Sequence, residues 1–233
     1  MALIYFSFGV LTFLNTDSAN VIHGGWLLGI VATESLVIPG ALVAPSTGAA
    51  SPAVFVLIHM FWGVGLVLYA VFMTLFAYRI FFFGFGTDDI TPLLWVIMGA
   101  AAISTNAGST LVLHASGLPF LHDTRPFIDG VTLIIWAWAT WWIPLLVLRG
   151  IRKHGVRGIP LTYTPLFWAL VFPLEMYSLA TLRLSLASDF SPLRVIAHAM
   201  LWVAVAAWAL TFAGLVVACQ RSLRDFSRPV RAV

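Results

Sequence analysis

Three charged side chains stand inside long apolar stretches of the sequence and are the first candidates for chemistry. Glu34, Glu175 and Arg183 each have hydrophobic neighbours along the chain on both sides. Within a lipid bilayer a charged side chain costs about 2.5–3.5 kcal/mol on insertion scales, so it must face protein or water. Buried carboxylates relay protons and buried cations attract anions, so each of these residues indicates an ion path.

Two prolines fall in stretches of the same kind. Pro39 and Pro173 have no N–H to donate, so each would leave one helical carbonyl without its donor. Inside a membrane this is tolerated where the helix lines a cavity or packs on neighbouring helices. Each proline therefore indicates either a kinked pore wall or a simple packing kink, and both interpretations stay open.

A polar run interrupts a third apolar stretch. Ser104, Thr105 and Asn106 are followed by Ser109 and Thr110. Hydroxyl and amide groups are weak ligands that suit the wall of a pore. The same groups also form hydrogen bonds between packed helices, and that interpretation stays open beside the first.

Three histidines, His59, His114 and His198, are of a type that binds haem or metal ions. They fall on three separate predicted helices and have no local ligand spacing. The single cysteine, Cys219, excludes an internal disulfide and every multi-cysteine metal site. The sequence also lacks a catalytic triad signature, a phosphate loop and a dinucleotide fingerprint. We therefore expect no metal, no cofactor and no enzymatic activity.

The composition shows what kind of elements must hold these residues. Of the 233 residues, 61% are hydrophobic and 9% are charged, and the mean hydropathy is +1.00, so most side chains face lipid. A helix needs about 20 apolar residues to cross the hydrocarbon layer. We predict an all-α, polytopic membrane helix bundle, a single transmembrane domain over residues 1–233 with short connections. Six stretches are long enough, and Met1–Leu14 is a seventh, partial one: Val21–Val43, Ala53–Phe83, Pro92–Leu113, Phe127–Leu148, Thr164–Leu186 and Leu193–Cys219.

The distribution of basic residues predicts the orientation of this bundle. Loops and tails rich in Lys and Arg stay on the cytoplasmic side. Nine basic residues fall on one predicted face, whereas Arg125, Arg183 and Arg194 fall on or towards the other. The nine are Arg79, Arg149, Arg152, Lys153, Arg157, Arg221, Arg224, Arg228 and Arg231. We expect a protein of the inner (plasma) membrane with a cytoplasmic C-terminus, whose basic tail touches anionic lipid and binds no nucleic acid.

Four stretches carry a resemblance to a known family. Residues 168–184, WALVFPLEMYSLATLRL, are similar to the W-x-x-x-F-P-L-G-M-Y-x-x-A-T-x-x-L pattern of the tellurite-resistance/C4-dicarboxylate transporter family. That family comprises the bacterial relatives of plant slow-type anion channels. The stretches 24–36 (GGWLLGIVATESL), 98–108 (MGAAAISTNAG) and 139–146 (ATWWIPLL) agree with it in the expected order. The resemblance covers essentially the whole chain.

The resemblance implies a ten-helix protein of five hairpins, in which five inner helices ring a pore and the subunits form homotrimers. Aligned from the C-terminus, Met1–Leu14 corresponds to the remnant of helix four. The inner helices present are then Val21–Val43, Pro92–Leu113 and Thr164–Leu186, and two are missing. We therefore expect that the 233-residue chain does not form a closed pore by itself.

In the family an aromatic side chain on the proline-kinked ninth helix plugs the pore, and by motif this residue is Phe172. Arg183 lies eleven positions on, about 20° around a helix and about 16 Å nearer the outer face, so it would share the same stripe. Glu175 departs from the family's glycine. A packing role for Phe172, and an ion pair of Arg183 with Asp129 or Asp189, are the alternatives.

The predicted function is an anion channel that passes small monovalent anions when Phe172 swings aside. Weak contacts along such a path let an ion leave as easily as it binds. The alternative is a proton-coupled C4-dicarboxylate or tellurite-linked transporter, with Glu34 or Glu175 as the proton carrier.

Overall fold

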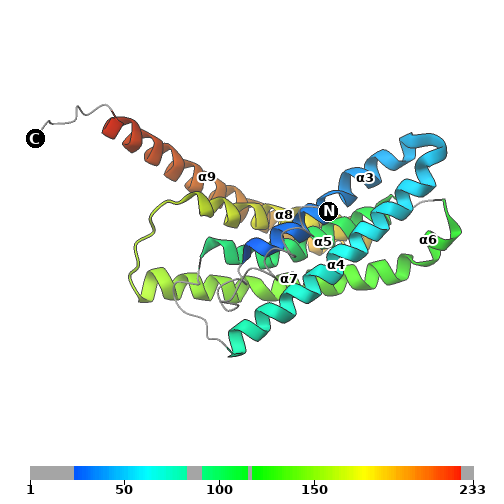
Figure 1. Cartoon of the computed structure of the whole chain (residues 1–233), viewed down its shortest axis with the longest axis horizontal. Coiled ribbons are helices and arrows are strands. Elements are labelled where there is room, and N and C mark those ends of the chain that lie inside the picture. Colours follow the sequence, from blue (N-terminus) through cyan, green and yellow to red (C-terminus); the bar gives the residue numbers. More distant parts are fainter. Residues whose placement is uncertain (1–23, 83–90, 115–116, 227–233) are drawn as a thin grey trace, which may run out of the picture.

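The computed structural model describes residues 24–82, 91–114 and 117–226, and every regular element in these ranges is a helix (Figure 1). The prediction of an all-α polytopic bundle is confirmed. The predicted segment Met1–Leu14 lies outside the described residues. The α-helices are α2 (Leu27–Ser35), α3 (Val37–Val43), α4 (Ser51–Phe82), α5 (Trp95–Leu113), α6 (Pro119–Asp123), α7 (Arg125–Ile151), α8 (Trp168–Ala187) and α9 (Leu193–Phe226). Short turns of other helix types are η1 (Gly24–Trp26), η2 (Ala44–Ala50), η3 (Pro92–Leu94), η4 (Arg152–Val156, a π-helix) and η5 (Pro165–Phe167).

Five helical stretches of the described chain are long and apolar enough to cross a membrane. The first, Leu27–Phe82, contains two of the predicted spans, because the chain reverses direction inside η2 (Figure 1). Gly48 makes the reversal possible with φ 57° and ψ −123°, a backbone conformation that glycine adopts at little cost. The other four stretches are Pro92–Leu113, Arg125–Val156, Pro165–Ala187 and Leu193–Arg224.

Helix α9 is the element whose predicted end is least accurate. It continues past Cys219 to Phe226. The apolar run stops near Cys219, but Gln, Arg and Leu follow it, and these residues favour a helix whether or not lipid surrounds them. The Pro92–Leu113 span, by contrast, has the predicted bounds.

Helix α5 forms the centre of the bundle, and every residue from Val96 to Val112 is buried. Helix α8 runs parallel to it, because Gly99 meets Pro173 near the start of both helices and Thr110 meets Arg183 near their ends. Helices α2 and α3 run the same way, since Glu34 meets Ser104 of α5 and the later residues of α3 pack with the later residues of α5. We call α2–α3, α5 and α8 the forward helices.

Helices α4, α7 and α9 run in the opposite direction and are called the return helices. On α4, Trp62 Nε1 donates to the Ser104 carbonyl (3.1 Å) while Tyr69 Oη donates to the Ile97 carbonyl (3.2 Å), so α4 is antiparallel to α5. On α7, Trp136 and Thr140 bond to Thr181 and Tyr177 of α8 in reverse order. Ser178 donates to Ala197 and closes the α8–α9 pair. Each forward helix is thus followed by a return helix, which makes three hairpins in the described chain.

Two forward helices begin with the same five-residue device. The sequences 91–95 (TPLLW) and 164–168 (TPLFW) each place an extended Thr before a Pro that opens a 3-10 turn, and the α-helix starts at the Trp. Proline suits this position because its N–H is not needed there and its φ is already helical. The repeat therefore marks the start of a forward helix.

Glu34 is buried between α2, α4 and α5, with none of its surface exposed. The Ser104 hydroxyl donates to Oε1 at 3.1 Å. Gly65 of α4 leaves the room for this carboxyl group, because a Cβ built there would lie 2.6 Å from Glu34 Cδ. The core can therefore accommodate the Glu34 side chain only because residue 65 is a glycine.

We predict that Gly65→Ala destabilises the protein by about 1–3 kcal/mol, as overpacking of a filled core does. In a Glu34→Ala background the same glycine change should be nearly neutral, because the clash is gone. The measurement is the thermal unfolding midpoint of the purified protein in detergent. Gly63→Ala on the same helix is the control, since a Cβ there meets nothing within 4 Å. Equal effects of the two alanines would contradict the prediction.

Candidate functional site

Phe172 owes its position to the proline that follows it. Pro173 is buried against α5, where a Cβ on Gly99 would lie 2.8 Å from Pro173 Cγ and 3.2 Å from its Cα. Helix α8 continues through Pro173 without interruption, and the Ala169 carbonyl loses its N–H donor there. The close contact with Gly99 thus holds the backbone beside Phe172 against the centre of the bundle.

One face of α8 is not covered by the described chain. Its members recur at helical spacing and are all at least partly exposed. We call this set the open face of α8: Phe172, Glu175, Met176, Leu179, Arg183 and Leu186. The structure therefore brings three of the predicted site residues, Phe172, Glu175 and Arg183, onto one face.

Arg183 reaches from this face towards α5. Its Nη1 donates to the Thr110 hydroxyl at 2.7 Å, and Thr110 has no exposed surface. The ion pair expected as an alternative is not formed: Asp129 pairs with Arg125 at 3.7 Å. Within the described ranges no carboxylate lies within 4 Å of the Arg183 guanidinium. A cation without a counter-ion beside an open face is suited to an anion.

The polar run of α5 lies inside the bundle. Ser104 bonds to Glu34, and Thr105 donates to the Ala101 carbonyl of its own helix at 2.9 Å. Asn106 Nδ2 donates to Met176 Sδ at 3.5 Å, and Asn106 Oδ1 has no partner in the described chain. Asn106 and Thr110 are thereby in contact with residues of the open face, Met176 and Arg183. The role of this run in a pore wall stays a prediction.

The remaining predicted site residues lie elsewhere. Glu34 is enclosed by α4 and α5, whereas Glu175 is exposed on α8, so the structure does not bring the two carboxyl groups together. Pro39 is exposed in α3. The helix is interrupted at Leu36, between α2 and α3. In a continuous helix the ring of Pro39 would clash with the carbonyl four residues earlier, and the interruption falls at that point. Whether these three residues take part in transport stays a prediction.

The three histidines each bond to their own helix. His59, His114 and His198 place Nδ1 against the carbonyl four residues earlier, at 2.6, 3.0 and 2.6 Å. Among the described residues no three His, Cys, Asp or Glu side chains are grouped so as to hold a metal ion. The structure therefore gives these imidazoles a helix-bound role and does not assemble them into one site.

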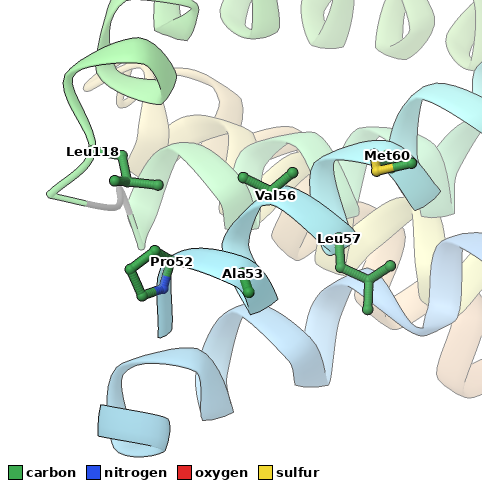
Figure 2. Close-up of a pocket in the computed structure, with 6 residues that line it drawn as sticks. All are labelled: Pro52, Ala53, Val56, Leu57, Met60 and Leu118. Atoms are coloured by element: carbon green, nitrogen blue, oxygen red, sulfur yellow. The ribbon is translucent and has the colours of Figure 1, made fainter. Parts of the chain in front are cut away.

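A hollow of about 500 Å³ near the start of α4 has a different character (Figure 2). Its lining is apolar: Pro52, Ala53, Val56, Leu57 and Met60 of α4, together with Leu118 before α6. It offers no charge and no hydrogen-bonding side chain to a solute. The hollow therefore belongs to the apolar surface of the bundle.

The starts of the forward helices form a feature that the sequence reasoning missed. The turns η1, η3 and η5 lie next to one another, and the residues before α2, η3 and η5 make no side-chain cap. Uncapped N–H groups give each helix start a partial positive charge. The repeated TPL-x-W motif was the signal that would have located two of these starts.

The return helices bring their basic residues to the same end. Because they run opposite to the forward helices, they finish where the forward helices begin, on the left of Figure 1. We call this the basic end. Its cationic side chains in the described ranges are Arg79, Arg149, Arg152, Lys153, Arg157, Arg221 and Arg224. The ends of the return helices carry partial negative charge that opposes the helix starts, so the positive potential of this end comes mainly from its basic side chains.

Known proteins resemble this chain over most of its length. An uncharacterized membrane protein of Mycobacterium tuberculosis, found in two strains, is 36% identical over 149 residues, which are 64% of this chain and 75% of the relative. An uncharacterized transporter of Methanocaldococcus jannaschii is 25% identical over 191 residues, 82% of this chain and 53% of the relative. The chain thus spans about half the length of that archaeal relative. No solved structure matches it.

The family comparison covers more of the chain. The sequence pattern of the SLAC1 family, described as voltage-dependent anion channel, matches residues 1–216. It includes all three forward helices and the open face of α8. The parallel forward helices, the proline-containing α8 and the order of the motifs all lie within this range. The chain therefore belongs to the voltage-dependent anion channel family.

Proposed function

We propose that the protein is a channel for small anions, with the open face of α8 bordering the path. The observation that carries the proposal is the common direction of the three forward helices. Their starts meet at the basic end, and α5 and α8 finish near Arg183, which has no counter-ion in the described chain. An anion therefore meets basic side chains at one end of the bundle and an unpaired guanidinium near the other.

The charge at the basic end supports concentration of anions there. Each helix start is equivalent to about half a positive elementary charge. The ends of the three return helices contribute a similar negative charge, so the net field comes from the Arg and Lys side chains of the basic end. Basic side chains around one end of a path raise the local concentration of anions. We place this end in the cytoplasm, as the positive-inside rule predicts.

The middle of the open face supports a hydrophobic constriction. Phe172, Met176 and Leu179 lie on α8 between the two charged ends, with Glu175 as the one charged residue among them. An apolar narrowing binds an ion weakly, so it permits passage and can close by excluding water. Phe172 is half-buried, and its side chain serves as the gate because the backbone beside it is held by Gly99.

A second candidate function rests on Glu175. This carboxylate is exposed on the same face as Phe172 and Arg183. A proton-coupled carrier of C4-dicarboxylates, or a tellurite-linked transporter, would use Glu175 to carry the proton and Arg183 to bind a substrate carboxylate. The channel is preferred because the basic side chains and the unpaired Arg183 favour anions without requiring a coupled proton.

The assembly in the membrane follows from the apolar sides of the return helices. Helices α4 and α9 expose large side chains along most of their length, among them Val67, Trp202 and Leu210. Such surfaces meet lipid or another subunit. We propose a homotrimer in the inner (plasma) membrane, with lipid covering the remaining apolar surface.

Removal of the gate should open the path. We expect Phe172→Ala to raise anion conductance about tenfold or more in planar bilayers, which corresponds to a barrier lower by about 1.4 kcal/mol. Phe212→Ala, on α9 and 46% exposed, is the matched control and should leave the current unchanged. A well-folded Phe172→Ala protein with wild-type current would show that Phe172 is a packing residue.

Neutralising Glu175 should separate the two candidate functions. For a channel, Glu175→Gln keeps or raises a current that follows voltage at equal pH on both sides, because a repelling charge is removed from the path. Anion flux and C4-dicarboxylate uptake into proteoliposomes are measured with and without a proton gradient. Uptake that needs the gradient and disappears in Glu175→Gln would favour the carrier.

The orientation has its own test. A reporter active only in the cytoplasm should work when fused after Val233. The same reporter inserted after Gly48, in the turn at the opposite end of α4, should be silent there. The reverse pattern would place the basic end outside and remove the electrostatic argument for anions that start in the cytoplasm.

A further inference from the structure

Near the end of α5, a histidine and Arg183 form hydrogen bonds to the same residue, Thr110. His114 follows the last residue of the helix, and its Nδ1 lies 3.0 Å from the Thr110 carbonyl. A carbonyl can only accept, so Nδ1 carries the hydrogen in this bond. The other ring nitrogen, Nε2, has no partner among the described residues.

Thr110 joins the two basic side chains. Arg183 donates to its hydroxyl at 2.7 Å and His114 donates to its carbonyl at 3.0 Å. Both groups therefore lie within a few bond lengths of a residue that is itself fully buried. Arg183 and His114 are each half-buried, so both side chains remain partly exposed.

The ends of the neighbouring helices affect the electrostatic potential around His114. Helices α5 and α8 both finish at this end of the bundle, and their last carbonyls carry partial negative charge. The guanidinium of Arg183 offsets about one elementary charge of that potential. A second positive charge is then needed to make this mouth attractive to an anion, and a protonated imidazole supplies it.

We propose that Arg183, Thr110 and His114 form a binding site for small monovalent anions, such as nitrate or chloride, which binds them more tightly when His114 is protonated. Arg183 supplies N–H donors that the described residues leave unpaired, and protonated His114 supplies Nε2–H. A histidine side chain carries a positive charge only when it is protonated, so the charge of the site depends on His114. The inference deepens the proposed function by placing a proton-controlled site at the outer mouth.

Other ionisable groups near this end are separate from the site. Helix α7 brings Arg125 and Asp129, which pair with each other at 3.7 Å. Helix α6 brings His122 and Asp123, whose Nδ1 and Oδ1 lie 3.7 Å apart. Helix α4 brings His59, whose Nδ1 bonds to Phe55. Helix α2 brings the enclosed Glu34, and α8 brings Glu175 two turns below Arg183. Asp189 and Arg194 lie in the turn and the first residues beyond α8.

Binding can be measured without conduction, by the thermal shift that nitrate causes in the purified full chain relative to gluconate. A ligand that binds the folded state raises its stability in proportion to ln(1 + [L]/Kd). We expect the apparent Kd for nitrate to fall about tenfold between pH 8 and pH 5.5, which corresponds to about 1.4 kcal/mol. His114→Gln should keep the pH 8 affinity and lose the increase at pH 5.5.

Two further variants and two controls complete the design. Arg183→Gln should abolish the nitrate shift at both pH values, and Arg183→Lys should retain part of it because the charge remains. His198→Gln is the control for the histidine, since His198 makes the same bond to its own helix, on α9. Arg194→Gln is the control for the arginine, because Arg194 is an exposed cation near the same end. Both controls should behave as wild type.

The inference is overturned if His114→Gln keeps the full pH response, or if Arg183→Gln still binds nitrate. The outcome is distinct from a failure of the proposed function. If nitrate binds as expected but no variant conducts anions, the site stands and the channel does not. If anions flow but binding is the same in every variant, the channel stands and the site does not.

Discussion

The contact of Gly99 with Pro173 is the interaction on which the rest of the arrangement depends. It brings the two parallel helices α5 and α8 as close as their backbones allow. From this point Thr110 lies eleven residues on along α5, and Arg183 lies ten residues on along α8. These steps rise about 16 Å and about 15 Å, so the contact at one end aligns the hydrogen bond at the other. The register of α5 and α8, the position of Phe172 and the bond from Arg183 to Thr110 thus share one origin.

Small residues also allow the other neighbours of α5 to pack closely against it. In lipid there is no hydrophobic force between helices, and close packing of small residues takes its place. Helix α5 carries Gly99, three alanines at 100–102, Ala107 and Gly108, and neighbours use this space: Thr132 and Trp62 contact Gly108. A helix with larger side chains could not be enclosed on all sides by α2, α4, α7 and α8. Its polar residues are therefore satisfied by its own carbonyls or by single contacts with those neighbours.

The bounds of the membrane spans could be predicted well from the sequence. The contacts between the spans could not. Pro92–Leu113 has the predicted bounds because Thr91 and Pro92 set a start that depends only on local backbone chemistry. The partner of Arg183 was sought among the carboxylates Asp129 and Asp189, since opposite charge is the only pairing signal in a single sequence. The partner is the neutral Thr110, and that follows from helix register, which composition does not encode. The face shared by Phe172, Glu175 and Arg183 was predictable, because helical spacing alone decides it.

The same central contact also limits what can move. Bending α8 at Pro173 would be the obvious motion for a helix that lacks one hydrogen bond, because the freed Ala169 carbonyl offers little resistance. Pro173, however, fills the space left by Gly99, and tilting it towards α5 would drive its ring into the α5 backbone. Tilting it away would empty the centre of the bundle and break the contact of Thr110 with Arg183. Phe172 lies on the open face and is only partly buried, so fewer contacts hold its side chain than hold the proline that follows it. The gate that we propose would therefore move as an aromatic side chain over a fixed backbone, while the helices stay packed.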